Sequence, residues 1–74
     1  MNKLASKFGS LLLASRTSKG ITQQEVAEAA SISVRWYQKI ESGVRMPGTR
    51  TAICLVLYLN LDLECVREEV GLVV

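Results

Sequence analysis

The 74-residue sequence contains no histidine and only two cysteines, Cys54 and Cys65. Side chains that bind transition metals are therefore scarce, and the sequence predicts neither a metal site nor a cofactor. No paired carboxylates and no nucleophile with an evident base mark a catalytic centre, so we expect no enzyme activity. Both cysteines lie in apolar surroundings, which favours reduced core residues; the alternatives are a redox role or an interface.

Long apolar runs are also lacking. The densest, residues 51–63, is well short of the roughly 20 residues needed to cross a bilayer. The N-terminal stretch 4–13 is interrupted by polar residues, so it does not resemble a signal peptide. We therefore expect a cytoplasmic protein without a membrane partner.

The net charge is small, because nine Lys and Arg face seven Asp and Glu to give +2. The distribution is uneven: residues 1–50 carry eight basic and three acidic side chains, whereas residues 51–74 carry one basic and four acidic ones. Such asymmetry is typical of a polyanion-binding part joined to a differently used part, although scattered solvated charges can also produce it.

An apolar content of 49% is enough for one small core, so we expect a single domain over residues 1–74. The spacing of apolar residues and the capping signals predict an all-α fold. The five expected helices run from Leu4 to about Ser18 before Gly20, from a Thr22–Glu25 capping box to a break at Ser31, from a Ser33 cap to Gly43, from a Thr49 cap to about Asn60, and from an Asp62 cap to Gly71.

The third expected helix has a polar, basic face opposite an apolar one. Arg35 and Lys39 can donate to guanine O6 and N7, and Gln38 suits adenine N6 and N7. Val34 can contact a thymine methyl group. These four residues are the candidate base contacts, although the same face considered alone could be an ordinary solvated one.

The second and third expected helices follow the layout of a helix-turn-helix, over about residues 22–43. Ala27 supplies the small side chain that lets two such helices cross closely. The stretch 16–27, followed by residues 33–43 and Pro47, resembles the Cro/CI-type (XRE-like) helix-turn-helix DNA-binding family of phage repressors and small bacterial transcriptional regulators.

This resemblance implies a five-helix, lambda-repressor-like DNA-binding domain in which the third helix reads bases. It implies that Gln23 binds a DNA phosphate and braces the third helix, and that Ser33 contacts the DNA backbone. It further implies a partly buried ion pair between Arg16 and Glu41, which joins the first helix to the third and has a structural role.

Two residues depart from the family pattern. Ser31 stands where the family commonly has glycine, and a left-handed serine costs about 1 kcal/mol, so the turn either differs slightly or is mildly strained. Trp36 lies between the two faces of the third helix, where it either packs at the edge of the core or points its indole N–H to a phosphate. The candidate phosphate contacts are Gln23, Ser33, Trp36, Arg45 and Arg50.

The fourth expected helix is apolar nearly all round, and one small core can cover only part of it. We therefore expect a homodimer through about residues 51–74, with a monomer as the alternative. A two-fold dimer would place two third helices about 34 Å apart, on successive major grooves of a palindromic operator. The expected interface residues are Val56, Leu59, Val66, Leu72 and Val73.

These patterns together predict a transcriptional regulator that binds double-stranded DNA, most simply a repressor that occludes a promoter. The alternative is a protein-interaction module of the same fold, such as an antitoxin or a regulatory subunit, that binds a partner protein.

Overall fold

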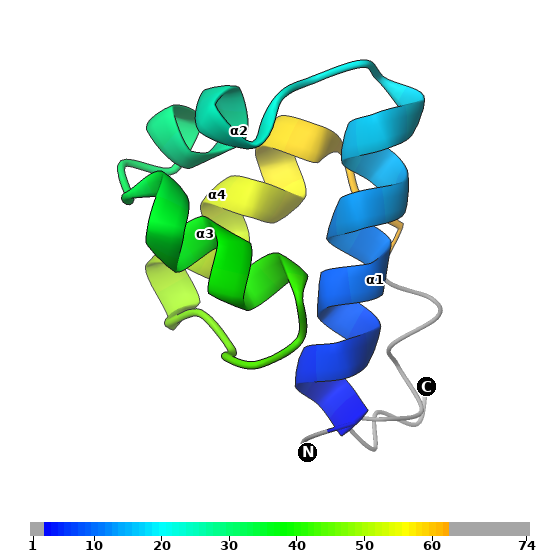
Figure 1. The fold of residues 1–74 in the computed structure, drawn as a ribbon, viewed down its shortest axis with the longest axis vertical. Coiled ribbons are helices and arrows are strands. Elements are labelled where there is room, and N and C mark those ends of the chain that lie inside the picture. The colour runs from blue at the N-terminus through cyan, green and yellow to red at the C-terminus, as the bar shows by residue number, and fades with distance from the viewer. Residues whose placement is uncertain (1–2, 63–74) are drawn as a thin grey trace.

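The computed structural model describes residues 3–62, and this part of the chain is helical and contains no strand. Its helices are α1 (Lys3–Ser18), α2 (Gln23–Ala29), α3 (Val34–Glu41) and α4 (Thr49–Leu59). Figure 1 shows α1 along one side of the molecule, α2 and α3 on the other, and α4 behind them. The α1 and α2 helices each pack against both α3 and α4.

The helical prediction is confirmed for this part of the chain, but the count of five helices is not supported. Four helices are present among residues 3–62, and the fifth, expected to follow Asp62, lies outside the described residues. No helix in the described part combines the length and apolar character that crossing a membrane requires.

Side-chain caps begin α2 and α3, as the sequence predicts. The Glu25 backbone N–H donates to the Thr22 hydroxyl oxygen over 3.1 Å. The Trp36 backbone N–H donates to the Ser33 hydroxyl oxygen over the same distance. Each hydroxyl satisfies an N–H group that has no partner within its own helix, which fixes where the two helices start.

The predicted start of α4 is wrong by one residue. Gly48 is the N-cap and forms no side-chain cap hydrogen bond, whereas Thr49 is already the first helical residue. Glycine at an N-cap leaves the first turn of a helix without a side-chain acceptor. The predicted break at Asn60 is confirmed, because this residue takes a left-handed conformation with φ of 51°.

A glycine turn ends α3 at the predicted place. Gly43 has φ of +83°, and its N–H donates to the Ile40 carbonyl over 3.1 Å. The Val44 N–H donates to the Lys39 carbonyl, also over 3.1 Å. This pair of hydrogen bonds is the Schellman motif, which satisfies the last carbonyls of a helix and turns the chain away.

The turn between α2 and α3 contains a left-handed serine. Ser31 has φ of 58°, so the strained form of this turn is the one that the chain adopts. The Ser31 and Ile32 N–H groups donate back to the carbonyls of Glu28 and Ala27. These hydrogen bonds hold the short connection that sets α3 across α2.

The core lies where all four helices meet. Six of its larger side chains are almost fully buried, and they are Leu12, Val26, Tyr37, Ile40, Leu55 and Leu59. A hydrogen bond of 3.2 Å from the Ser15 hydroxyl to the Leu59 carbonyl also joins α1 to the end of α4.

The prediction that Leu59 lies in a dimer interface is therefore wrong. Leu59 is 0% exposed, because it shares with Leu55 the face of α4 that enters the core. Val56 is half-buried and packs against the same core. The other expected interface residues, Val66, Leu72 and Val73, lie outside the described residues.

Candidate nucleic-acid interface

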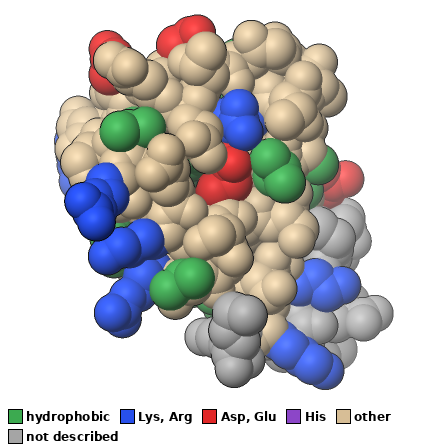
Figure 2. Space-filling model, viewed as in Figure 1, with side chains coloured by type: hydrophobic (Ala, Val, Ile, Leu, Met, Phe, Trp, Pro, Cys, Tyr) green, Lys and Arg blue, Asp and Glu red, His purple; other side chains and the backbone are tan. Residues whose placement is uncertain are grey.

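The helix α3 presents one polar face to solvent and buries the other. The candidate base contacts all have exposed side chains, and they are Val34, Arg35, Gln38 and Lys39. Tyr37 and Ile40, on the opposite side, are fully buried. Figure 2 shows Lys and Arg side chains gathered at the left edge of the view, on the side where α3 lies in Figure 1. The four side chains therefore share one basic, accessible surface.

The candidate phosphate contacts differ in how far their side chains are exposed. Ser33, Arg45 and Arg50 are exposed. Trp36 is half-buried and packs against the core, which is the first of the two placements considered from the sequence. The Arg45 backbone N–H donates to the Lys39 carbonyl over 3.2 Å, so the loop that carries Arg45 is fixed against the last turn of α3.

The first turn of α4 adds to the positive potential near this loop. It contains no acidic residue and has no side-chain cap, so its N–H groups are available to a negatively charged group. Arg50 lies in the same turn.

Arg16 and Glu41 form a two-pronged ion pair between α1 and α3. The Arg16 Nε donates to Glu41 Oε2 over 2.7 Å, and Nη2 donates to Oε1 over 3.1 Å. The third nitrogen, Nη1, donates to the Ile21 carbonyl over 2.9 Å. Only 14% of the Arg16 side chain and 7% of the Glu41 side chain are exposed. One guanidinium thus ties α1, the α1–α2 loop and α3 together.

The surroundings of this pair keep Glu41 ionised. Burial by itself would raise the pKa of Glu41, but hydrogen bonds from Arg16 and Gln23 and the charge of Arg16 hold it below its ordinary value. The hydrogen bond to Glu41 in turn raises the pKa of Arg16.

Tyr37 lies beside this pair. Burial, followed by the neighbouring Glu41 carboxylate, raises the pKa of the Tyr37 phenol above its ordinary value. Its hydroxyl is buried and forms no hydrogen bond of standard geometry with a described residue. Tyr37 therefore remains neutral and contributes mainly its apolar ring to the core.

Two glutamines connect the ion pair to the exposed face of α3, and sequence reasoning missed this connection. Gln23 Nε2 donates to Glu41 Oε1 over 3.0 Å, and Gln38 Nε2 donates to Gln23 Oε1 over 3.1 Å. The family resemblance implied that Gln23 braces α3, but it did not indicate a contact with Gln38. The partners are 18 and 15 residues apart, so helical spacing alone carried no signal for these bonds.

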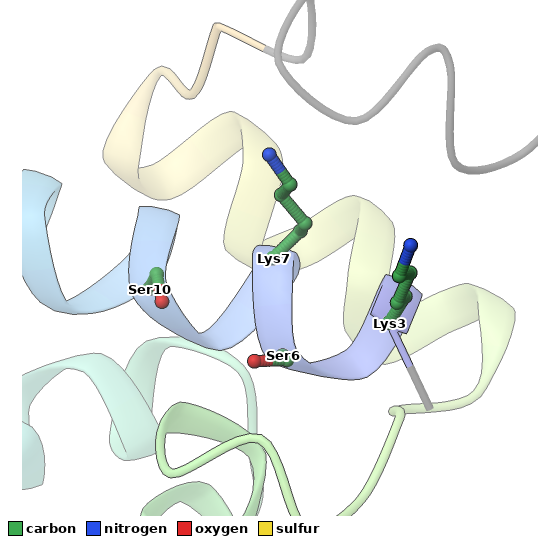
Figure 3. Close-up of a pocket in the computed structure, with 4 residues that line it drawn as sticks. All are labelled: Lys3, Ser6, Lys7 and Ser10. Carbon is green, nitrogen blue, oxygen red and sulfur yellow. The ribbon is translucent and has the colours of Figure 1, made fainter. Parts of the chain in front are cut away.

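A second feature missed from the sequence is an open hollow on α1, lined by Lys3, Ser6, Lys7 and Ser10. Figure 3 shows both lysine side chains extending from the same side of the helix. The backbone of Ser6 lies against the Gly43 turn, since a Cβ added to Gly43 would come within 3.0 Å of the Ser6 Cα. The N-terminal half of α1 therefore packs, through its backbone at Ser6, against the turn that ends α3.

Among residues 3–62, no group of three or more His, Cys, Asp or Glu is arranged to hold a metal ion. Cys54 has a free thiol and packs, half-buried, against the core. Cys65 lies outside the described residues.

Comparison with known proteins agrees with this geometry. A family model described as helix-turn-helix matches residues 12–64. The chain belongs to the XRE-like helix-turn-helix family. Its relatives include the ImmF control region 10 kDa protein of Bacillus phage phi105, which is 33% identical over 61 residues that make up 82% of this chain and 68% of that protein. They also include the uncharacterized HTH-type transcriptional regulator YqaF of Bacillus subtilis (strain 168), 50% identical over 55 residues, 74% of this chain and 72% of that protein.

A solved structure supports the same family. The clp gene regulator ClgR from Corynebacterium glutamicum superposes with a TM-score of 0.77 at 25% sequence identity, over 92% of this chain and 73% of that one. The matched residues 12–64 include α2, the turn at Ser31 and α3. Membership implies DNA binding and a role in the regulation of transcription.

Proposed function

We propose that the protein is a repressor that binds double-stranded DNA in a sequence-specific manner and acts as a homodimer on a palindromic operator. The observation that carries this proposal is the exposed face of α3 with Arg35, Gln38 and Lys39, held from behind by Tyr37 and Ile40 in the core. A rigidly anchored helix with donors and acceptors on its outer face suits the major groove, where each base pair presents a distinct pattern.

Each side chain on this face has a separate task in the proposal. Arg35 and Lys39 donate to guanine, Gln38 contacts adenine, and Val34, which is 39% exposed, contacts a thymine methyl group. Neutral and basic groups around α3 bind the DNA backbone. These phosphate contacts are Gln23, Ser33, Arg45 and Arg50, whereas Trp36 packs at the edge of the core.

Homodimer formation is assigned to the outer face of α4 in place of the buried Leu59. Ile53 and Leu57 are 53% and 75% exposed and lie one helical turn apart. Two such faces in contact remove apolar surface from water, at about 25 cal/mol for each Å². A two-fold arrangement presents two copies of α3 to successive major grooves, and this arrangement matches a palindromic site.

Sequence selection from a random pool of DNA duplexes tests the proposal most directly. We expect a palindromic site with two half-sites about one helical turn apart. The affinity for that site should fall steeply with salt, with a log–log slope of about −0.9 for each phosphate contact. A chain that selects no sequence, and whose weak binding to DNA does not respond to salt, would contradict the proposal.

Two substitutions separate the roles of the basic residues. Arg35→Ala should relax the preference at one base pair, whereas Arg45→Ala should weaken binding to all duplexes alike and lower the salt slope by about 1. Lys19→Ala is the matched control, because Lys19 is an exposed cation on the α1–α2 side of the molecule. The assignment fails if Arg35→Ala and Arg45→Ala change the base preferences in the same way.

The dimer is tested by the mass of the protein in solution. Leu57→Ser should shift the wild-type dimer toward monomer and weaken binding to the full palindrome more than binding to a half-site. Leu13→Ser is the matched control, since Leu13 is a 45% exposed leucine on α1. A monomeric wild-type protein, or an equal response to both substitutions, would remove α4 as the interface.

A protein-interaction module remains the second candidate, and the exposed Ile53, Leu57 and Tyr58 favour it. Under this alternative α4 binds a different protein, as in an antitoxin or a regulatory subunit. The DNA selection separates the two candidates, because such a module need not prefer any DNA sequence.

A further inference from the structure

The hydrogen bonds from Glu41 to Gln38 form a chain with a fixed direction. An ionised carboxylate accepts hydrogen bonds and cannot donate them. The Gln23 amide must therefore turn its NH₂ group toward Glu41 Oε1, where the observed distance is 3.0 Å. Its carbonyl oxygen then points away from Glu41, toward α3.

The same argument fixes the orientation of the Gln38 side-chain amide. Gln23 Oε1 can only accept, so Gln38 must direct its own NH₂ group to that atom, 3.1 Å away. A solvent-exposed glutamine is ordinarily free to exchange the positions of its oxygen and nitrogen by a rotation. Here the exchange would place two carbonyl oxygens or two NH₂ groups against each other, so the chain disfavours it.

The start of this chain is well anchored. Arg16 holds both oxygens of Glu41, and the Glu41 side chain is only 7% exposed. Both glutamines stand nearer to solvent, with Gln23 half-buried and Gln38 exposed. The buried Glu41 carboxylate thus sets the orientation of the exposed Gln38 amide. In the proposed function, this amide faces the major groove.

We propose that Gln23 is a positioning residue that makes Gln38 selective for adenine, by transmitting the acceptor-only character of Glu41 to the Gln38 amide. One hydrogen of Gln38 Nε2 is used by Gln23. The second hydrogen can donate to adenine N7, while Gln38 Oε1 accepts from adenine N6. A fixed order of donor and acceptor favours this base over those that need the reverse order. This inference rests on the proposed function of α3.

If Gln23 only bound a DNA phosphate, a different result would be expected. The second hydrogen of Gln23 Nε2 is free to bind a phosphate, and phosphate contacts carry no sequence information. If this were the whole role of Gln23, its loss would weaken binding to every duplex by the same factor. Partial unfolding of a variant would also lower all affinities equally. The ratio of affinities between two bases is therefore the readout that isolates positioning.

The experiment measures dissociation constants for duplexes that differ at one base pair of the selected site. The position read by Gln38 is identified as the one whose preference disappears in Gln38→Ala. We expect wild type to prefer adenine there by about tenfold or more, as one good bidentate contact allows. Gln23→Ala should reduce this preference to within about threefold. The variant that combines Gln23→Ala with Gln38→Ala should lose no more of the adenine preference than either single variant.

Two controls complete the test. Gln24→Ala, an exposed glutamine at the next position of α2, should leave the adenine preference unchanged. The preference at the base pair read by Arg35 should remain in Gln23→Ala. An unchanged adenine ratio in Gln23→Ala would overturn the inference and leave the proposed function intact, whereas a wild type without any base preference would overturn both.

An exchange of the two side chains gives an independent check. Glu41→Gln alone removes the acceptor-only group that sets the direction, so the adenine preference should fall. Gln23→Glu combined with Glu41→Gln places an acceptor-only carboxylate directly against Gln38, and the preference should return even where overall affinity is lower. If the combined variant preferred adenine no more than Glu41→Gln does, the inference that Glu41 sets the orientation of the Gln38 amide would be contradicted.

Discussion

Gly9 offers a direct test of how α1 positions the DNA-facing helix. It lies within α1, at the point where this helix crosses the end of α3. A Cβ added here would lie 2.5 Å from the Glu41 carbonyl oxygen and 2.8 Å from the Ile40 carbonyl oxygen. Both neighbours are backbone atoms, so rotation of a side chain cannot relieve the contact. Gly9→Ala must push α1 and α3 apart.

Two opposing effects set the magnitude. Alanine is favoured over glycine within a helix by about 1 kcal/mol. Overpacking in a tight interface costs about 1–3 kcal/mol, and two simultaneous backbone contacts place this site toward the upper end. We therefore expect a net loss of about 2 kcal/mol. In a domain of this size such a loss lowers the midpoint of thermal unfolding by roughly 8–16 °C.

Thermal unfolding followed by circular dichroism at 222 nm measures this change. Ala14→Gly, at an exposed position of the same helix, measures the helix-propensity effect without the contact and should cost about 1 kcal/mol. Adding that value to the Gly9→Ala loss isolates the steric cost. A Gly9→Ala protein as stable as wild type, or more stable, would refute the close crossing of α1 and α3.

Three further changes address the turns and the ion pair. Ser31→Gly removes the strain of a left-handed serine backbone, and urea unfolding should show that the free energy of unfolding rises by up to about 1 kcal/mol. A lower free energy of unfolding would contradict the presence of strain at this turn. Gly48→Ser adds an N-cap oxygen to α4 where a new Cβ meets nothing within 4 Å, and thermal unfolding should show that the free energy of unfolding rises by about a few tenths of a kcal/mol. Because the folded pKa of Glu41 lies below its unfolded value, its stabilisation is complete above the unfolded pKa of about 4.3 and is lost as the pH falls through the folded value. Glu41→Gln should therefore cost less stability at pH 3 than at pH 7. Glu28→Gln, at an exposed position of α2, is the control and should cost little at either pH. A cost of Glu41→Gln that does not change with pH would contradict this prediction.

The described helices and the inner and outer faces of α3 could be predicted from the order of the residues. Thr22 and Ser33 cap helices with hydrogen bonds to residues three positions later, and Gly43 ends one with bonds to residues only a few positions earlier. Such interactions depend on local spacing, which the order of residues displays. The alternation of exposed and buried positions on α3 follows from the helical repeat for the same reason.

Which of several equally apolar or polar residues enter a contact depends on how the helices pack against one another. On α4, Leu57 and Leu59 are the same residue type, yet one is 75% exposed and the other 0%. Their difference depends on the angle at which α4 meets α1 and α2. The bonds from Glu41 through Gln23 to Gln38 likewise join residues 15 and 18 positions apart. Helical periodicity indicates which face each residue occupies. Only the packing of one helix on another brings particular atoms to 3.0 and 3.1 Å from each other, and that packing makes three polar side chains a directed chain of hydrogen bonds.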